Sequence, residues 1–216
     1  DSGNVSSGMI TFANGSGLFT APANLSVRAY VADGTSGQTV GVQLTKVNTS
    51  VVSALGNIHN IAANPATLAT VAIGASTGPG DFNPQNDVNV WQSNLTISNE
   101  DVYLKRFTLR EIGSVDSKDI KNLRLFVDGT QVAIDADLDV DGYATFLMNH
   151  RMLTGTRVVK VMADVIGGST RTMQFSFRGF YDIDVMDESY NVGVKATAGV
   201  SFPEDPTAST IGTPSV

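Results

Sequence analysis

Apolar residues alternate with polar ones through much of the second half of this chain, and this spacing restricts the fold more than any other sequence feature. Successive side chains of a β-strand point to opposite faces of its sheet, so alternation indicates strands with one buried face. The pattern covers three stretches: Leu123, Leu125 and Val127; Val159, Val161, Ala163 and Val165; and Met173, Phe175 and Phe177. The sequence therefore predicts an all-β fold, an antiparallel β-sandwich, with two modules in the chain.

Two dipeptides predict tight turns between these strands. Asp128-Gly129 separates two alternating segments, which is typical of a two-residue hairpin loop. Gly167-Gly168 precedes the alternating segment that contains Phe175, and glycine adopts the positive φ angles that a tight reversal needs. Both dipeptides therefore predict β-hairpins.

The spacing of apolar residues also predicts where the strands lie. The expected strands are near 88–97, 101–110, 121–127, 130–135, 143–148, 156–166, 171–179 and 181–185, and residues 191–202 close the module. Between Val102 and Leu109 the apolar residues change from one face to the other. Such a change of parity indicates a β-bulge.

The first half of the chain is less regular. Residues 25–31 and 40–44 alternate on either side of Asp33-Gly34, which predicts another hairpin. Residues 51–61 carry apolar side chains at spacings of three and four, as in a short helix, but paired valines and an internal glycine lower their helix propensity. A helix and a strand or loop both stay open there, and residues 68–73 predict one more strand.

Residues 75–87 are rich in turn-forming residues and lack an apolar period, which indicates a connection between modules. We expect a division near residue 95. Residues 1–95 would form an N-terminal β-rich region, residues 96–203 the sandwich, and residues 204–216 a tail or linker.

The composition is typical of an extracellular all-β protein, because only 16% of residues are charged and glycine numbers 21. A net charge of −7 argues against a nucleic-acid partner. The absence of cysteine excludes thiol catalysis, disulfides and Cys-ligated zinc. No segment approaches the roughly 18 apolar residues of a transmembrane helix. We expect export, with a signal peptide removed before Asp1.

One acidic segment resembles part of a calcium loop. Asp137, Asp139 and Asp141 alternate ahead of Gly142, as in the first half of such a loop. The position of the closing glutamate is Met148, and the flanking residues alternate as strands. The segment therefore fits either a calcium site, with calcium as the one cofactor to consider, or an acidic hairpin with a turn at Asp141-Gly142.

A second group of carboxylates lies near the C-terminal end. Two interpretations stay open for it: a cation site at a module boundary, or a solvated strand edge. Its members are Asp182, Asp184, Asp187, Glu188, Glu204 and Asp205.

Five Asn-x-Ser/Thr sequons are candidate glycosylation sites, since this tripeptide is the acceptor for N-linked glycans. They are at Asn4, Asn14, Asn24, Asn48 and Asn94.

The sequence offers no catalytic residues that we would assign. His59 and His150 are the only histidines, and neither belongs to a metal-binding or nucleophile-activating motif. Asp182 and Asp184 could pair on one strand face, but a glycosidase also needs aromatic sugar platforms. Trp91 is the only tryptophan and is better suited to a core or interface than to such a platform.

Three segments of the second half resemble a module that is repeated in large surface proteins of small candidate-phylum bacteria. They are Asn99-Glu-Asp-Val-Tyr-Leu-Lys-Arg-Phe107, Leu123-Arg-Leu-Phe-Val-Asp-Gly-Thr-Gln-Val132 and Gly155-Thr-Arg-Val-Val-Lys-Val-Met-Ala-Asp-Val-Ile-Gly-Gly-Ser-Thr-Arg171. The resemblance covers roughly residues 90 to 200 and implies an immunoglobulin-like fold. It also implies a non-enzymatic role in a surface layer or an adhesin.

The sequence thus predicts an extracellular cell-surface subunit that assembles with copies of itself into a filament or surface layer. The expected mechanism is strand addition, in which an N-terminal segment pairs with a sheet edge of the next subunit. The donor residues would be Met9, Ile10, Thr11, Phe12, Leu18 and Phe19. Two alternatives stay open: an adhesive module that binds glycan or protein, with or without calcium, and a virion protein.

Overall fold

The computed structural model describes Ala29, Thr35 and residues 37–47, 50–61, 67–199 and 201–213. The chain separates into two compact units. The described residues of the smaller unit fall within Asn24–Thr67, and those of the larger unit within Leu68–Val216.

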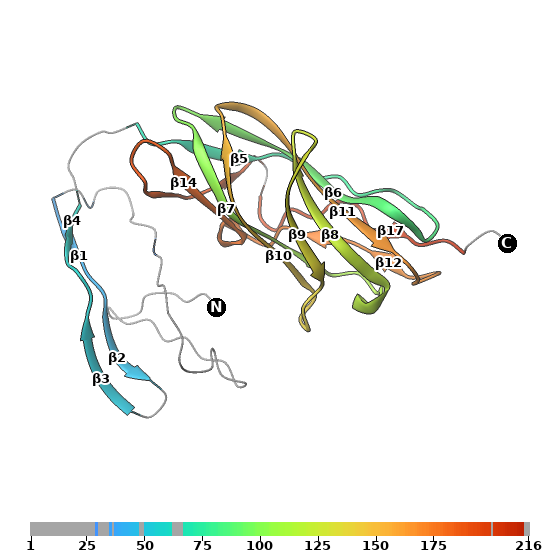
Figure 1. Ribbon diagram of the computed structural model, residues 1–216, viewed down its shortest axis with the longest axis horizontal. Helices are drawn as coiled ribbons and strands as arrows, with labels where there is room; N and C mark the ends of the chain where they lie inside the picture. The colour runs from blue at the N-terminus through green and yellow to red at the C-terminus, as the bar shows by residue number, and fades with distance from the viewer. Residues whose placement is uncertain are drawn as a thin grey trace. The chain divides into compact units, whose positions relative to one another are not determined.

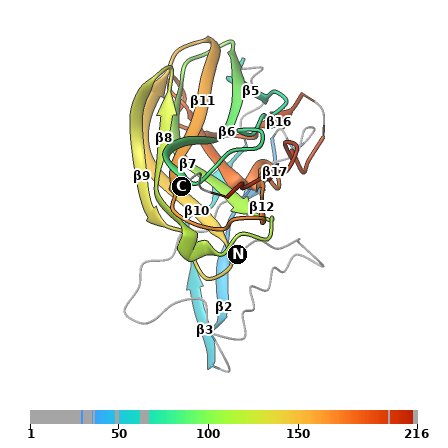
Figure 2. The ribbon, with the colours of Figure 1, turned by 90° about the vertical axis from the view of Figure 1, so that its right-hand side faces the viewer.

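The larger unit is a β-sandwich, as the alternation predicts (Figure 1). One sheet has six strands in the order β16-β5-β6-β11-β8-β9, and Figure 2 shows β8, β9 and β11 side by side in it. These strands are Thr70–Ile73 (β5), Gln85–Ser98 (β6), Ile120–Val127 (β8), Thr130–Asp137 (β9), Gly155–Val165 (β11) and Thr197–Ala198 (β16). All its pairings are antiparallel except that of β16 with β5.

The second sheet has five strands, in the order β10-β7-β14-β15, with β13 also paired to β7. They are Val102–Glu111 (β7), Tyr143–Met152 (β10), Phe175–Ser176 (β13), Ile183–Asp187 (β14) and Gly193–Val194 (β15). A separate short pair joins Thr172–Met173 (β12) to Ser209–Thr210 (β17). Short 3-10 helices occupy Ser117–Asp119 (η1) and Phe180–Asp182 (η2).

The core lies between the two sheets and is centred on aromatic side chains. Trp91 of β6 packs against Phe107 of β7 with ring centroids 5.3 Å apart, and Phe107 packs against Phe177 at the same distance. Trp91 and Phe107 are fully buried and come from different sheets. Aromatic pairs at this spacing add stability beyond their buried area, so these contacts hold the two sheets together. Trp91 is thus a core residue.

The Asp128-Gly129 turn and the β-bulge are both confirmed. Asp128 and Gly129 have φ angles of 48° and 81°, and Val127 pairs with Thr130 across them, as in a two-residue hairpin with two left-handed residues. In β7 the pairing register with β14 shifts beside Lys105. The extra residue moves the following apolar side chains onto the buried face.

The hairpin predicted at Gly167-Gly168 is wrong. β11 pairs with β6 and β8, whereas β12 pairs with β17. The chain therefore leaves the six-stranded sheet at this point. Both glycines are instead needed for close packing. A Cβ atom on Gly167 would lie 2.7 Å from Oδ1 of Asp119, and a Cβ atom on Gly168 would lie 2.8 Å from Cγ2 of Val115.

The smaller unit is a two-stranded ribbon over residues 37–61. Thr39–Val40 (β1) pairs with His59–Asn60 (β4), and Gln43–Val47 (β2) pairs with Ser50–Leu55 (β3), both antiparallel. Of the alternatives left open for residues 51–61, the strand is therefore correct. The hairpin predicted from residues 25–31 has its first strand outside the described residues.

The expected division near residue 95 falls inside β6, whose 14 residues belong to one strand of the larger unit. The described chain divides at Thr67 and Leu68 instead. Residues 204–213 also belong to the sandwich, because β17 pairs with β12 and Oδ1 of Asp81 accepts a hydrogen bond from N of Thr210 at 2.7 Å.

Candidate functional site

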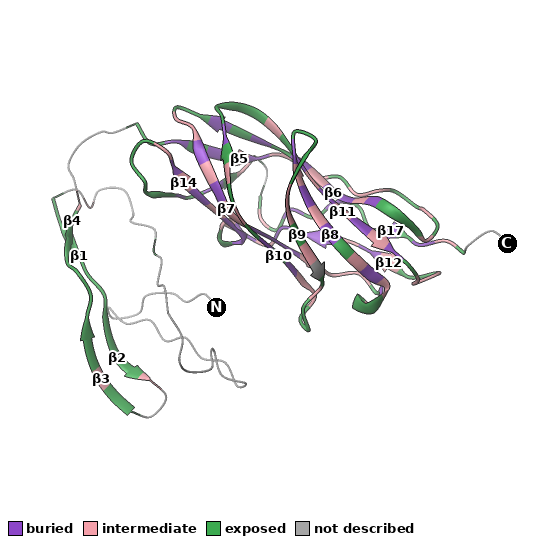
Figure 3. Ribbon diagram, in the orientation of Figure 1, coloured by how far each residue is buried: buried purple, intermediate pink, exposed green. Residues whose placement is uncertain are grey.

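The ribbon of residues 37–61, hereafter the ribbon, exposes apolar side chains. Val51 is 85% exposed, Leu55 67% and Val42 51%. None of its described residues is classed as buried, and Figure 3 shows its strands almost entirely as exposed surface. An isolated two-stranded hairpin is at best marginally stable in water. The ribbon is therefore the part of the described chain that most needs a partner.

The ribbon also lacks the charges that usually protect strand edges. Lys46 is the only Lys, Arg, Asp or Glu among residues 37–61. In the first 80 residues of the chain the charged residues are Asp1, Arg28, Asp33 and Lys46, although the whole chain has 14 Lys and Arg and 21 Asp and Glu. Natural proteins place charges on exposed edges to prevent pairing with other chains. The ribbon is thus suited to pair with another strand.

The β10 edge of the sandwich differs, because side chains accept hydrogen bonds from two of its backbone N–H groups. β9 and β10 are the last strands of their two sheets. Oδ2 of Asp135 on β9 accepts a hydrogen bond from N of Thr145 on β10 at 2.8 Å. Oδ1 of Asp139 accepts one from N of Tyr143, also at 2.8 Å. Part of the β10 edge is therefore closed by carboxylates of the adjacent sheet and loop.

The predicted calcium residues lie in this same region. Asp137 ends β9 and pairs with Lys121 of β8, whereas Asp139 accepts hydrogen bonds from N of Asp141 and N of Tyr143 within the turn. Gly142 has a φ of 82°, as expected for the turn at Asp141-Gly142. Among the residues that the structure describes, no group of three or more His, Asp or Glu side chains is placed to hold a metal ion. Calcium binding here stays a prediction.

Asp187 of the second acidic group is fully buried and bonded to backbone N–H groups. Its Oδ2 accepts from N of Ala69 at 2.7 Å, and its Oδ1 accepts from N of Ser189 and N of Tyr190 at 2.9 Å each. A buried carboxylate is tolerated when such bonds replace its hydration. Asp187 thus ties the residue before β5 to the turn between β14 and β15.

Asp182 and Glu204 have similar roles. Oδ2 of Asp182 accepts from N of Arg178 and N of Gly179 at 2.8 and 3.0 Å, and Oε1 of Glu204 accepts from N of Ser76 at 2.8 Å. Burial raises the pKa of Asp182, although its two backbone hydrogen bonds oppose that change. Since Asp182, Asp187 and Glu204 are all buried, the solvated-edge interpretation of this acidic group is wrong for these three residues.

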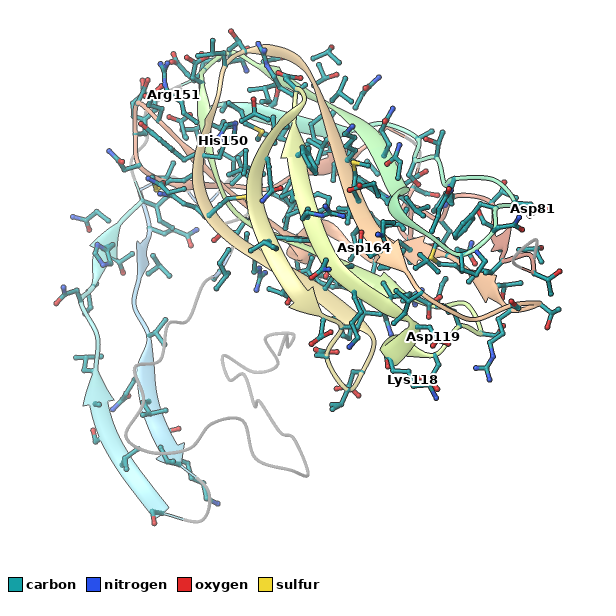
Figure 4. The ribbon with its side chains drawn as sticks, turned by 45° about the vertical axis from the view of Figure 1, so that its right-hand side comes forward. Asp81, Lys118, Asp119, His150, Arg151 and Asp164 are labelled. Carbon is teal, nitrogen blue, oxygen red and sulfur yellow. The ribbon has the colours of Figure 1, made fainter. Side chains whose placement is uncertain are left out.

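A shallow hollow lies where the β8–β9 turn approaches the end of β10. It has a volume of about 240 Å³, and its lining includes Asp128, His150 and Arg157. Arg157 pairs with Asp128 at 3.2 Å and with the carbonyl oxygens of Leu153 and Thr154. Figure 4 shows His150 and Arg151 at one end of the larger unit, far from Lys118 and Asp119 at the other. The guanidinium group of Arg157 thus links the β8–β9 turn to the turn after β10.

The remaining predicted residues are separated or lie outside the described part of the chain. The donor segment, from Met9 to Phe12 with Leu18 and Phe19, lies outside it, as do Asn4, Asn14, Asn24 and Asn48. Asn94 is exposed on β6. His59 is on β4 of the ribbon and His150 is on β10, so the two histidines belong to different units.

Comparison with protein-family models and with curated proteins finds no match to this chain. Within the described residues, no helix is long and apolar enough to cross a bilayer.

The ribbon was not predicted from the sequence as a surface that needs a partner. The sequence does contain a sign of this unprotected ribbon, because almost all charged residues of the chain come after residue 80. A segment with β-branched residues and few charges is a strand whose edges are unprotected.

Proposed function

We propose that this protein is a non-enzymatic structural subunit that assembles with copies of itself at the cell surface, as a filament or a surface layer. The observation that carries the proposal is the ribbon, which exposes Val42, Val51 and Leu55 and has little charge. Association that covers these side chains would gain roughly 25 cal/mol for each Å² of apolar surface removed from water. The resemblance to repeated bacterial surface modules supports the same role.

The mechanism that we propose is strand addition between subunits. An extended segment that joins an open sheet edge gains main-chain hydrogen bonds, while its alternate side chains enter the acceptor. The N-terminal segment around Met9 to Phe12, with Leu18 and Phe19, is the proposed donor on sequence grounds. Its apolar residues stand among small polar ones, as is usual for an edge strand.

The chemistry of the buried carboxylates supports a structural role. Asp182, Asp187 and Glu204 are engaged by backbone N–H groups. A general acid or base must instead reach a proton of its substrate. These residues therefore stabilise the sandwich in our account, and the function is assigned to edges and exposed apolar surface.

Electron microscopy of the purified full chain tests this function. We expect ordered polymers, and we expect a variant without residues 1–12 to keep its β-rich circular dichroism spectrum but to lose the polymers. Normal polymers from that variant would exclude the donor role of this segment. Dispersed single particles of the full chain, with binding to a glycan or protein surface, would instead support an adhesive module.

A further inference from the structure

We propose that β3 pairs edge to edge with β3 of a second copy of this chain, antiparallel, so that two ribbons form one four-stranded sheet. This inference rests on the proposed self-assembly and names one of its contacts. It concerns the ribbon and is separate from the N-terminal donor segment.

The need for additional strands follows from the geometry of the ribbon. β2 and β3 form a sheet of two strands, with Gln43 opposite Leu55 and Val47 opposite Ser50. Within the described residues, the second edge of β3 has no strand partner. Three or more strands are usually needed for a stable sheet, and pairing two ribbons supplies four.

The residues of β3 favour this edge over that of β2. β3 reads Ser50-Val-Val-Ser-Ala-Leu55 and has no charge, proline or glycine. Six-residue segments of this kind are the ones that pair most readily with other strands. β2 carries Lys46, and two such lysines brought together across a shared edge would repel each other.

A second copy of β3 fits this edge better than the sandwich does. The β9–β10 margin carries Asp135, Asp137 and Asp139, and its backbone N–H groups at Tyr143 and Thr145 are already bonded. An uncharged strand would make no favourable electrostatic interaction with those carboxylates. An antiparallel pair of identical uncharged strands is self-complementary about a twofold axis, which is the usual symmetry of a homodimer contact.

Single cysteines provide a direct test, because the chain has none. We would introduce Val51→Cys, Val52→Cys, Ser53→Cys and Ala54→Cys into the full chain, one at a time, and oxidise each variant. In an antiparallel self-pair only the positions at the twofold axis face their own copies. A disulfide needs Cα atoms roughly 4.4 to 6.8 Å apart, so we expect covalent dimers at one or two adjacent positions only.

Thr45→Cys on β2 is the matched control. In the proposed sheet the two β2 strands are separated by both β3 strands, which places them about 14 Å apart. A disulfide between them is therefore too long to form. Equal cross-linking at Thr45 and at every β3 position would overturn the pairing, since it would indicate non-specific encounter.

A charge on β3 provides the second test. Ala54 is exposed and lies opposite the uncharged Leu44 of β2, so Ala54→Lys loses no buried contact and adds no like-charge pair within the ribbon. We expect it to weaken association by about tenfold through like-charge repulsion between the two β3 strands. Thr45→Lys should change association much less. Polymers that persist in Ala54→Lys, without β3 cross-links, would exclude this contact while self-assembly itself would remain supported. A full chain that stays monomeric and gives no cross-links would overturn both.

Discussion

Two buried aspartates of the sandwich differ in how their oxygens are used. Asp187 uses both oxygens to accept backbone N–H groups, whereas Asp182 accepts two of them with Oδ2 alone. An asparagine has only one acceptor oxygen, so it can replace Asp182 but not Asp187 without leaving a donor unpaired.

We therefore expect Asp187→Asn to lower the free energy of unfolding by about 1 to 3 kcal/mol, the cost of a buried backbone N–H left facing another donor. Asp182→Asn should cost clearly less. Urea denaturation of both variants, followed by circular dichroism, measures the difference. Equal costs would show that the hydrogen bonds of Asp187 do not support the link to Ala69.

Asp182 should also make stability depend on pH. Burial raises its pKa in the folded protein, whereas the unfolded chain has the ordinary value of about 3.9. Between these two values the folded state binds more protons, so its stability increases as the pH falls. The stability of the wild type relative to Asp182→Asn should therefore improve between about pH 7 and pH 4. Urea denaturation of both proteins over this pH range measures the difference between their free energies of unfolding. A difference that does not change with pH would contradict this prediction.

The burial of these carboxylates could not be predicted from their own sequence. Asp187 is followed by Glu188 and Ser189, which reads as a polar strand end. Its partner N–H belongs to Ala69, 118 residues away. Only the folded arrangement of β5 against β14 decides that this side chain is buried.

At the scale of elements, alternation predicted most strands of the sandwich correctly, because one buried face leaves a period of two in the sequence. The turn dipeptides were less reliable. Asp128-Gly129 joins paired strands, whereas Gly167-Gly168 leads out of the six-stranded sheet. The difference depends on Val115 and Asp119, which pack against the two glycines from distant positions.

These two turns predict different responses to alanine. Gly129 has a positive φ but no atom near its Cβ position, so Gly129→Ala should cost about 1 kcal/mol of backbone strain. At Gly168 the same strain adds to a contact of 2.8 Å with Val115, so Gly168→Ala should cost about 2 to 4 kcal/mol. Thermal unfolding of both variants tests this order. A milder effect at Gly168 would mean that its packing against Val115 relaxes easily.

At the scale of the whole molecule, the two units differ in how they use their surfaces. The described part of the larger unit buries 32 apolar residues and its buried carboxylates accept hydrogen bonds, whereas the described ribbon buries no residue. The low charge of the first 80 residues could have been recognised in the sequence. The register of β2 with β3 and the exposure of Val51 could not, because they depend on which strands pair.

We expect residues 68–216 to fold without the rest of the chain, because the described core lies entirely within them. Their unfolding midpoint in urea should be close to that of the sandwich in the full chain. Loss of cooperative unfolding in this fragment would show that the first 67 residues contribute to the core.

Sedimentation velocity of the full chain beside residues 68–216, over a wide range of concentration, tests self-assembly most directly. We expect the full chain to form larger species as its concentration rises, while the fragment sediments as a monomer throughout. A full chain that stays monomeric at every concentration, or a fragment that assembles equally well, would contradict it.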